Sequence, residues 1–142
     1  MSATPSRPDA EPESPYKSAG GLRRIWLALK FSMRGLAHAF QVESAFRQEL
    51  ILAAVLVPVA LILWLPALQT LALIGSVMLV LIVELLNSSI EATVDRISFD
   101  HHRLSGRAKD LGSAAVFLAL LLCFITWVLI AGPVLLVRLH LT

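Results

Sequence analysis

Carboxylates and an amide recur at helical spacing in residues 83–95, which read VELLNSSIEATVD. At about 100° per residue, the polar side chains of this segment share one helix face roughly 80° wide. They are Glu84, Asn87, Ser88, Glu91 and Asp95. A carboxylate in or beside hydrocarbon is costly to keep charged, so such a residue indicates a functional site. This acidic stripe could hold a divalent cation and leave one carboxylate free as a base.

Two other segments carry polar groups that suit the same chemistry. Glu43 lies in the polar segment 41–49, just before the first long apolar run, and would sit at the depth of the acidic stripe if a membrane helix begins there. The segment 97–112, ISFDHHRLSGRAKDLG, carries Arg107 and Lys109. Arginine and lysine bind phosphate groups, but these two residues could equally serve only to fix membrane topology.

The composition predicts a small integral membrane protein. Of the 142 residues, 57% are hydrophobic, which is too apolar for a soluble domain of this size. The single cysteine, Cys123, cannot form a disulfide within the chain. The sequence has no P-loop, dinucleotide or protein-kinase motif, and we expect no nucleic-acid partner.

The distribution of apolar runs and charges divides the chain into a tail and one membrane domain. Residues 1–19 are rich in proline and polar residues and are predicted to be disordered. We predict a single domain at 20–142, made of an amphipathic surface helix at 22–40, spans at about 48–65, 68–95 and 113–137, and a loop at about 96–112. No lysine or arginine occurs between Gln48 and Asp95, so the positive-inside rule places the surface helix and the loop in the cytoplasm.

Three motifs closely resemble those of the prokaryotic diacylglycerol kinase family. They are E-x-x-N-S-x-x-E-x-x-x-D-R at 84–96, L-S-G-R-A-K-D-x-G-S-A-A at 104–115 and E-x-A-F-R-Q-E at 43–49. The resemblance implies an all-α homotrimer in the bacterial inner membrane, with a surface helix and three transmembrane helices per subunit. It also implies a cytoplasmic-side reaction in which ATP and Mg²⁺ phosphorylate diacylglycerol to phosphatidate.

The resemblance assigns roles to individual residues. Glu84 is similar to the general base of the family, and Glu43 and Glu91 to its metal-binding carboxylates. The positions that resemble ATP contacts are Arg24, Phe31, Glu43, Glu91, Ser98, Asp100, Lys109 and Asp110. Those that resemble lipid-substrate contacts are Arg24, Arg34, Ala45, Phe46, Arg47, Gln48, Glu49, Glu84 and Ser113. Asn87 and Asp95 match supporting positions.

The sequence departs from the family pattern in two places. The surface helix has Phe31 and Met33 where an aromatic residue and a tryptophan are usual, so any ATP contact of Phe31 is apolar. The segment 98–100, Ser-Phe-Asp, differs from the usual Gly-Ser-Glu, which affects the expected adenine or ribose contacts.

Two alternatives to a diacylglycerol kinase remain open from the sequence. Some relatives in the family phosphorylate undecaprenol, another membrane alcohol. A small transporter or channel subunit would also explain intramembrane carboxylates, because such groups can relay protons or cations. That second alternative leaves the basic segment 97–112 and the surface helix unexplained.

Overall fold

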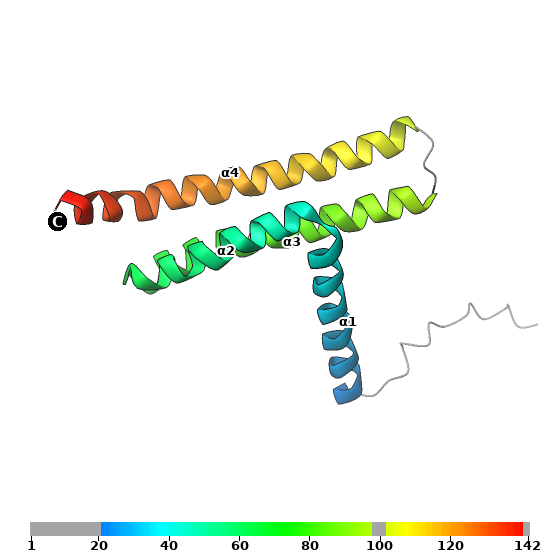
Figure 1. Cartoon of the computed structure of the whole chain (residues 1–142), viewed down its shortest axis with the longest axis horizontal. Helices are drawn as coiled ribbons and strands as arrows, with labels where there is room; N and C mark the ends of the chain where they lie inside the picture. The colour runs from blue at the N-terminus through cyan, green and yellow to red at the C-terminus, as the bar shows by residue number, and fades with distance from the viewer. Residues whose placement is uncertain (1–20, 98–101, 141–142) are drawn as a thin grey trace, which may run out of the picture. The chain divides into compact units, whose positions relative to one another are not determined.

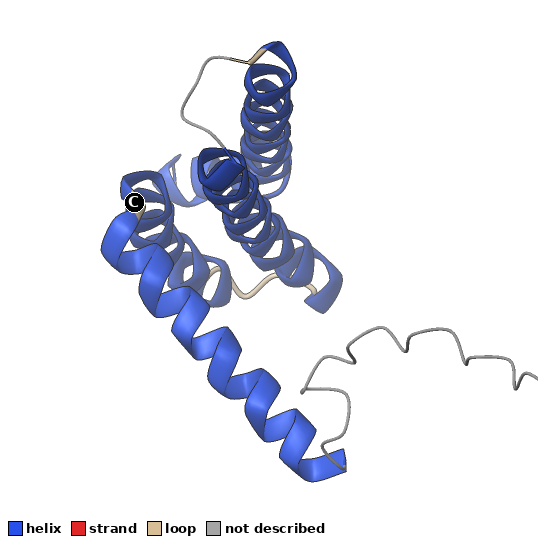
Figure 2. Ribbon diagram, turned by 90° about the vertical axis from the view of Figure 1, so that its right-hand side faces the viewer, coloured by secondary structure: helices blue, strands red, loops and turns tan. Residues whose placement is uncertain are grey.

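The computed structural model describes residues 21–97 and 102–140, and these residues form four α-helices and no strand (Figure 1). The helices are α1 (Gly21–Val42), α2 (Ser44–Ile62), α3 (Ala67–Ile97) and α4 (Arg103–His140). Figure 2 shows the same helices in blue, with short tan connections between them. The predicted all-α class is thus confirmed for the described residues. Since α2, α3 and α4 are each long and apolar enough to cross a membrane, this is a membrane protein.

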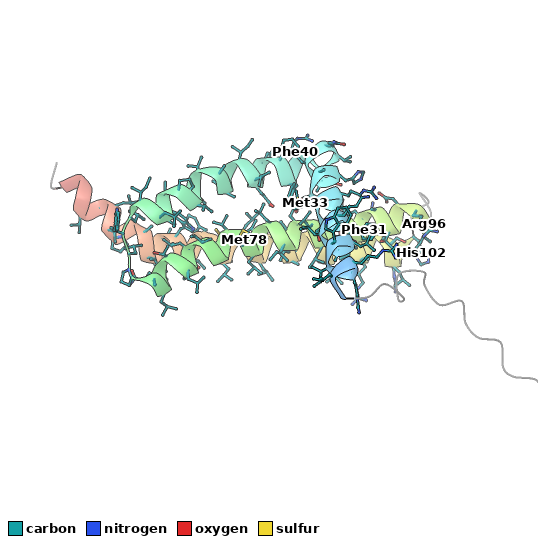
Figure 3. The ribbon with its side chains drawn as sticks, turned by 90° about the horizontal axis from the view of Figure 1, so that it is seen from below. Phe31, Met33, Phe40, Met78, Arg96 and His102 are labelled. Carbon is teal, nitrogen blue, oxygen red and sulfur yellow. The ribbon has the colours of Figure 1, made fainter. Side chains whose placement is uncertain are left out.

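The chain divides into two units between Ala37 and His38, so the first part of α1 is described by itself. Its apolar side chains are exposed, and a shallow groove of about 420 Å³ runs between Trp26 and Ala37. Lys30 Nζ lies 5.6 Å from the centre of the Trp26 ring, which is cation–π distance. Phe31 and Met33 are labelled on this helix in Figure 3. A helix is therefore present where one was predicted, and its place at a membrane surface stays a prediction.

The second unit begins with the end of α1 and a break in the helix at Glu43. The backbone of Glu43 is extended, with φ −89° and ψ 114°. Its N–H donates to the carbonyl of Ala39 (2.9 Å), and its own carbonyl accepts from the N–H of Arg47 (3.3 Å). The Arg47 guanidinium donates to the carbonyls of Phe40 (3.2 Å) and Gln41 (3.0 Å) and so caps the last turn of α1. Glu43 alone separates α1 from α2, although the sequence suggested a polar connector over 41–49.

The connection between α2 and α3 is a tight turn at Leu63–Pro66. Trp64 has a left-handed backbone, with φ 54°, which ends the helical path of α2. The carbonyl of Pro66 then accepts hydrogen bonds from the N–H groups of Gln69 (2.9 Å) and Thr70 (3.1 Å). Residues 67–70, expected from the sequence to belong to the turn, are therefore the first turn of α3.

In the second unit, α3 packs against both α2 and α4 and runs antiparallel to them (Figure 1). The buried side chains form two clusters along the bundle. One contains Ala53, Val77, Val80, Ala119 and Cys123, and the other contains Ala60, Leu63, Leu73 and Ala131. Both clusters contain alanines from facing helices, and small residues of this kind allow membrane helices to approach closely.

Helix α4 begins ten residues before the predicted third span. His102 precedes its first turn, where the carbonyl accepts from the Gly106 N–H (3.0 Å) and the ring Nδ1 accepts from the Leu104 N–H (3.2 Å). Figure 3 labels His102 and Arg96, which lie on either side of residues 98–101. The prediction of a loop through 112 was wrong for residues 103–112. Their helix-favouring leucine, alanine, lysine and arginine side chains form turns without an apolar periodicity that marks them as helix.

Much of the apolar surface of α2, α3 and α4 is exposed. The large side chains that are more than half exposed include Leu61, Leu68, Leu86, Phe117, Leu118, Phe124 and Leu129. Such a surface would be unfavourable in water and suits contact with lipid tails or with further membrane helices.

Candidate active site

The acidic stripe of α3 centres on Glu84, whose side chain is only 4% exposed. The carboxylates of Glu91 and Glu43 lie close enough for their charges to act on it, and so does Glu49. These four groups come from two helices and the residue that precedes α2. Because like charges repel strongly in a low-dielectric environment, this cluster favours a bound cation or proton.

One member of the cluster is held by a neighbouring amide. Asn87 Nδ2 donates a hydrogen bond to Glu91 Oε1 at 3.0 Å, one helical turn along α3. Asn87 is itself buried, 9% exposed, and its Oδ1 has no hydrogen-bond partner. The amide therefore orients Glu91 and leaves the second oxygen of that carboxylate available to a ligand.

The start of α4 brings a cation to the same end of α3. Lys109 Nζ lies 2.6 Å from Asp95 Oδ1, and the charge of Glu91 also acts on Lys109. The side chains of Lys109 and Asp95 are 38% and 43% exposed. Acidic and basic groups thus meet here, and Lys109 is accessible to an anionic ligand.

This ion pair leads to a prediction about ATP. We expect Asp95→Asn to raise the KM for ATP several-fold, because Asp95 restrains the ammonium group that would meet the phosphates. The melting temperature in detergent should hardly change, since a half-exposed ion pair contributes little to stability. Thr93→Ala on the same helix is the control, because the Thr93 hydroxyl bonds only the Ser89 carbonyl (2.8 Å). An unchanged KM with a strongly lowered melting temperature would give the pair a purely structural role.

The other predicted site residues fall into three groups. Ala45, Gln48, Asp110 and Ser113 are at least partly exposed, whereas Phe46 is buried and Arg47 caps α1. Arg24, Phe31 and Arg34 lie in the first unit, so their part in the site stays a prediction. Ser98 and Asp100 lie outside the described residues.

The metal prediction can be compared with the donor groups present. Within 21–97 and 102–140, no three His, Cys, Asp or Glu side chains form a metal site by themselves. Magnesium usually takes only one or two carboxylates and completes its shell with phosphate oxygens and water. Glu43 makes no hydrogen bond that caps α2, and Glu91 keeps one oxygen free of the Asn87 bond. The two carboxylates therefore fit a Mg²⁺ ion that is shared with phosphate.

Two contacts of this site were not predicted from the sequence. Glu49 was expected among lipid contacts, and its proximity to Glu84 is new. Gly112 packs directly on Asn87, with the side-chain oxygen of Asn87 in the space that a Cβ would take. An ionisable residue at the edge of an apolar run and a glycine inside a helical segment are the signals that pointed to them.

Known proteins match the chain over most of its length. A model of the family described as prokaryotic diacylglycerol kinase matches residues 30–131, which include the acidic stripe and the start of α4. The chain belongs to the prokaryotic diacylglycerol kinase family. This membership makes the protein a kinase and favours a catalytic role for the carboxylates over an ion pathway.

Individual relatives agree with the family assignment. The chain is 50% identical over 114 residues to a diacylglycerol kinase of Pseudomonas aeruginosa, covering 80% of this chain and 93% of that one. It is 53% identical over 109 residues to the diacylglycerol kinase of Escherichia coli, covering 75% and 88%. A diacylglycerol kinase of Haemophilus influenzae is 46% identical over 112 residues, covering 79% and 94%.

Proposed function

We propose that this protein transfers the γ-phosphate of ATP to the free hydroxyl of diacylglycerol, which yields phosphatidate and ADP. The observation that carries the proposal is the burial of Glu84 among carboxylates of two helices, in a chain of this family. The relatives from the three bacteria carry the name diacylglycerol kinase, which supports the lipid substrate. A buried carboxylate beside an apolar surface suits a substrate with a hydroxyl on an apolar body.

In the proposed reaction, the hydroxyl oxygen of the lipid attacks the γ-phosphorus in line with the bond to ADP. Glu84 accepts the hydroxyl proton as the new O–P bond forms, and the bond to the β-phosphate oxygen breaks. Phosphoryl transfer otherwise needs mainly positioning and charge neutralisation. Glu43 and Glu91 would hold Mg²⁺, which when bound neutralises charge on the phosphate oxygens.

The remaining residues of the site are assigned to substrate positioning. Lys109 would bind a phosphate oxygen as a point charge, in exchange for part of its pairing with Asp95. Asn87 keeps one oxygen of Glu91 occupied and so fixes the direction of the other. Glu49, beside Glu84, would contact the polar head of the lipid.

We also propose that three copies assemble in the bacterial inner membrane, with the active site on the cytoplasmic side. The exposed apolar surface of α2, α3 and α4 supports contact between copies within the bilayer. The clustering of arginine and lysine at one end of the bundle supports the orientation. Three slim helices enclose a substrate poorly, so a neighbouring copy would complete the site.

The experiment that tests this function is label transfer from ATP in mixed micelles of lipid and detergent. Purified protein would receive γ-labelled ATP and Mg²⁺ with either diacylglycerol or undecaprenol. We expect labelled phosphatidate and little label on undecaprenol. Label on undecaprenol alone would keep the family and the chemistry but replace the substrate. The absence of label on both lipids, from folded protein, would contradict the proposed function.

A further inference from the structure

The packing of Gly112 against Asn87 sets this glycine apart from the others that the structure describes. A Cβ on Gly112 would overlap Asn87 Oδ1 and would lie 3.3 Å from Asn87 Cγ and 3.8 Å from its Cα. At the other described glycines, a Cβ would meet nothing within 4 Å. They are Gly21, Gly35, Gly75, Gly106 and Gly132. The missing side chain at position 112 is therefore what admits the Asn87 amide between α3 and α4.

The space at Gly112 and the bond to Glu91 together fix the position of the Asn87 side chain. The amide is buried, and its Nδ2 is bonded to Glu91 Oε1 at 3.0 Å. Its Oδ1 makes no hydrogen bond that would hold it if the space at Gly112 were filled. A methyl group at position 112 would have to displace this amide or separate the two helices, since backbone and a short side chain offer little other relief.

We infer that Gly112 is a positioning residue of the active site, acting through Asn87 on the Glu91 carboxylate. The chain of contacts runs from α4 to α3 and then one turn along α3 to Glu91. The inference rests on the proposed function insofar as Glu91 is taken to bind the metal. It adds that a residue without a side chain controls how the ligand of that metal is oriented, as an outer-shell group does.

The test compares Gly112→Ala with wild type in metal binding as well as in activity. Mn²⁺ would replace Mg²⁺ as a probe, and free Mn²⁺ would be measured by electron paramagnetic resonance with a non-hydrolysable ATP analogue present. We expect the Kd for Mn²⁺, and the Mg²⁺ concentration that gives half-maximal activity, to rise about tenfold, the usual effect of losing an outer-shell contact. Gly132→Ala on the same helix is the matched control and should change neither value.

A double variant separates this route from general damage to the fold. In an Asn87→Ala background the amide is gone, so adding Gly112→Ala should cause no further loss of metal binding. Equal losses in both backgrounds, or wild-type metal binding by Gly112→Ala, would overturn the inference. If wild-type protein transferred no phosphate, the proposed function would fail, while the Mn²⁺ titrations would still decide the role of Gly112.

Discussion

Replacing Glu84 by glutamine is expected to lower the rate of phosphate transfer by about 10²–10⁴-fold, the usual contribution of a general base. The amide has nearly the shape of the carboxylate but cannot accept the proton of the lipid hydroxyl. ATP binding should survive, because the groups proposed to hold the nucleotide and its metal are Glu43, Glu91 and Lys109. The measurements are the initial rate of label transfer in mixed micelles and ATP affinity by calorimetry.

Gln69→Ala is the control for the effect of a substitution in α3. Gln69 is exposed at the opposite end of the helix, so this variant should retain wild-type turnover. A Glu84→Gln protein that folds like wild type and turns over at a similar rate would remove Glu84 from the role of base. Loss of ATP binding along with turnover would instead place Glu84 in the nucleotide site.

Glu91→Gln is expected to raise the Mg²⁺ concentration needed for half-maximal activity by at least about tenfold. The substitution removes the negative charge that a hard cation prefers, while the amide oxygen can still accept the hydrogen bond from Asn87. The local helix should therefore keep its geometry, and the effect should be confined to the metal. The measurement is the initial rate over a series of Mg²⁺ concentrations at saturating ATP.

Glu49→Gln provides the comparison, because Glu49 also lies beside Glu84 but is not proposed to bind metal. We expect this variant to change the KM for the lipid and to leave the Mg²⁺ requirement as it is in wild type. If Glu49→Gln and Glu91→Gln altered the Mg²⁺ requirement equally, the metal assignment would have to move toward Glu49.

The helices of the second unit could be predicted from the sequence because their apolar runs are long. Ends that depend on local hydrogen bonding were less accessible. Helix α4 begins at Arg103, where no apolar stripe marks a helix, and the break before α2 is confined to Glu43. The turn at Trp64 depends on a left-handed residue that is not glycine, which propensity alone does not predict.

The same limit applies to the candidate site. Helical periodicity placed Glu84, Asn87 and Glu91 on one face, and the hydrogen bond between Asn87 and Glu91 agrees with that spacing. Periodicity says which residues share a face and does not say which helix lies opposite. The contacts of Glu49 with Glu84 and of Gly112 with Asn87 cross between helices, so they required the packed structure.

The central claim, that phosphate passes directly from ATP to a lipid hydroxyl deprotonated by Glu84, can be tested by the stereochemistry at phosphorus. The protein would be supplied with diacylglycerol and ATP whose γ-phosphate is chiral through oxygen isotopes and sulfur. A single in-line displacement predicts inversion of configuration in the lipid product. Retention would mean two displacements and a phosphorylated side chain, and would contradict the role of Glu84 as the base that activates the lipid hydroxyl.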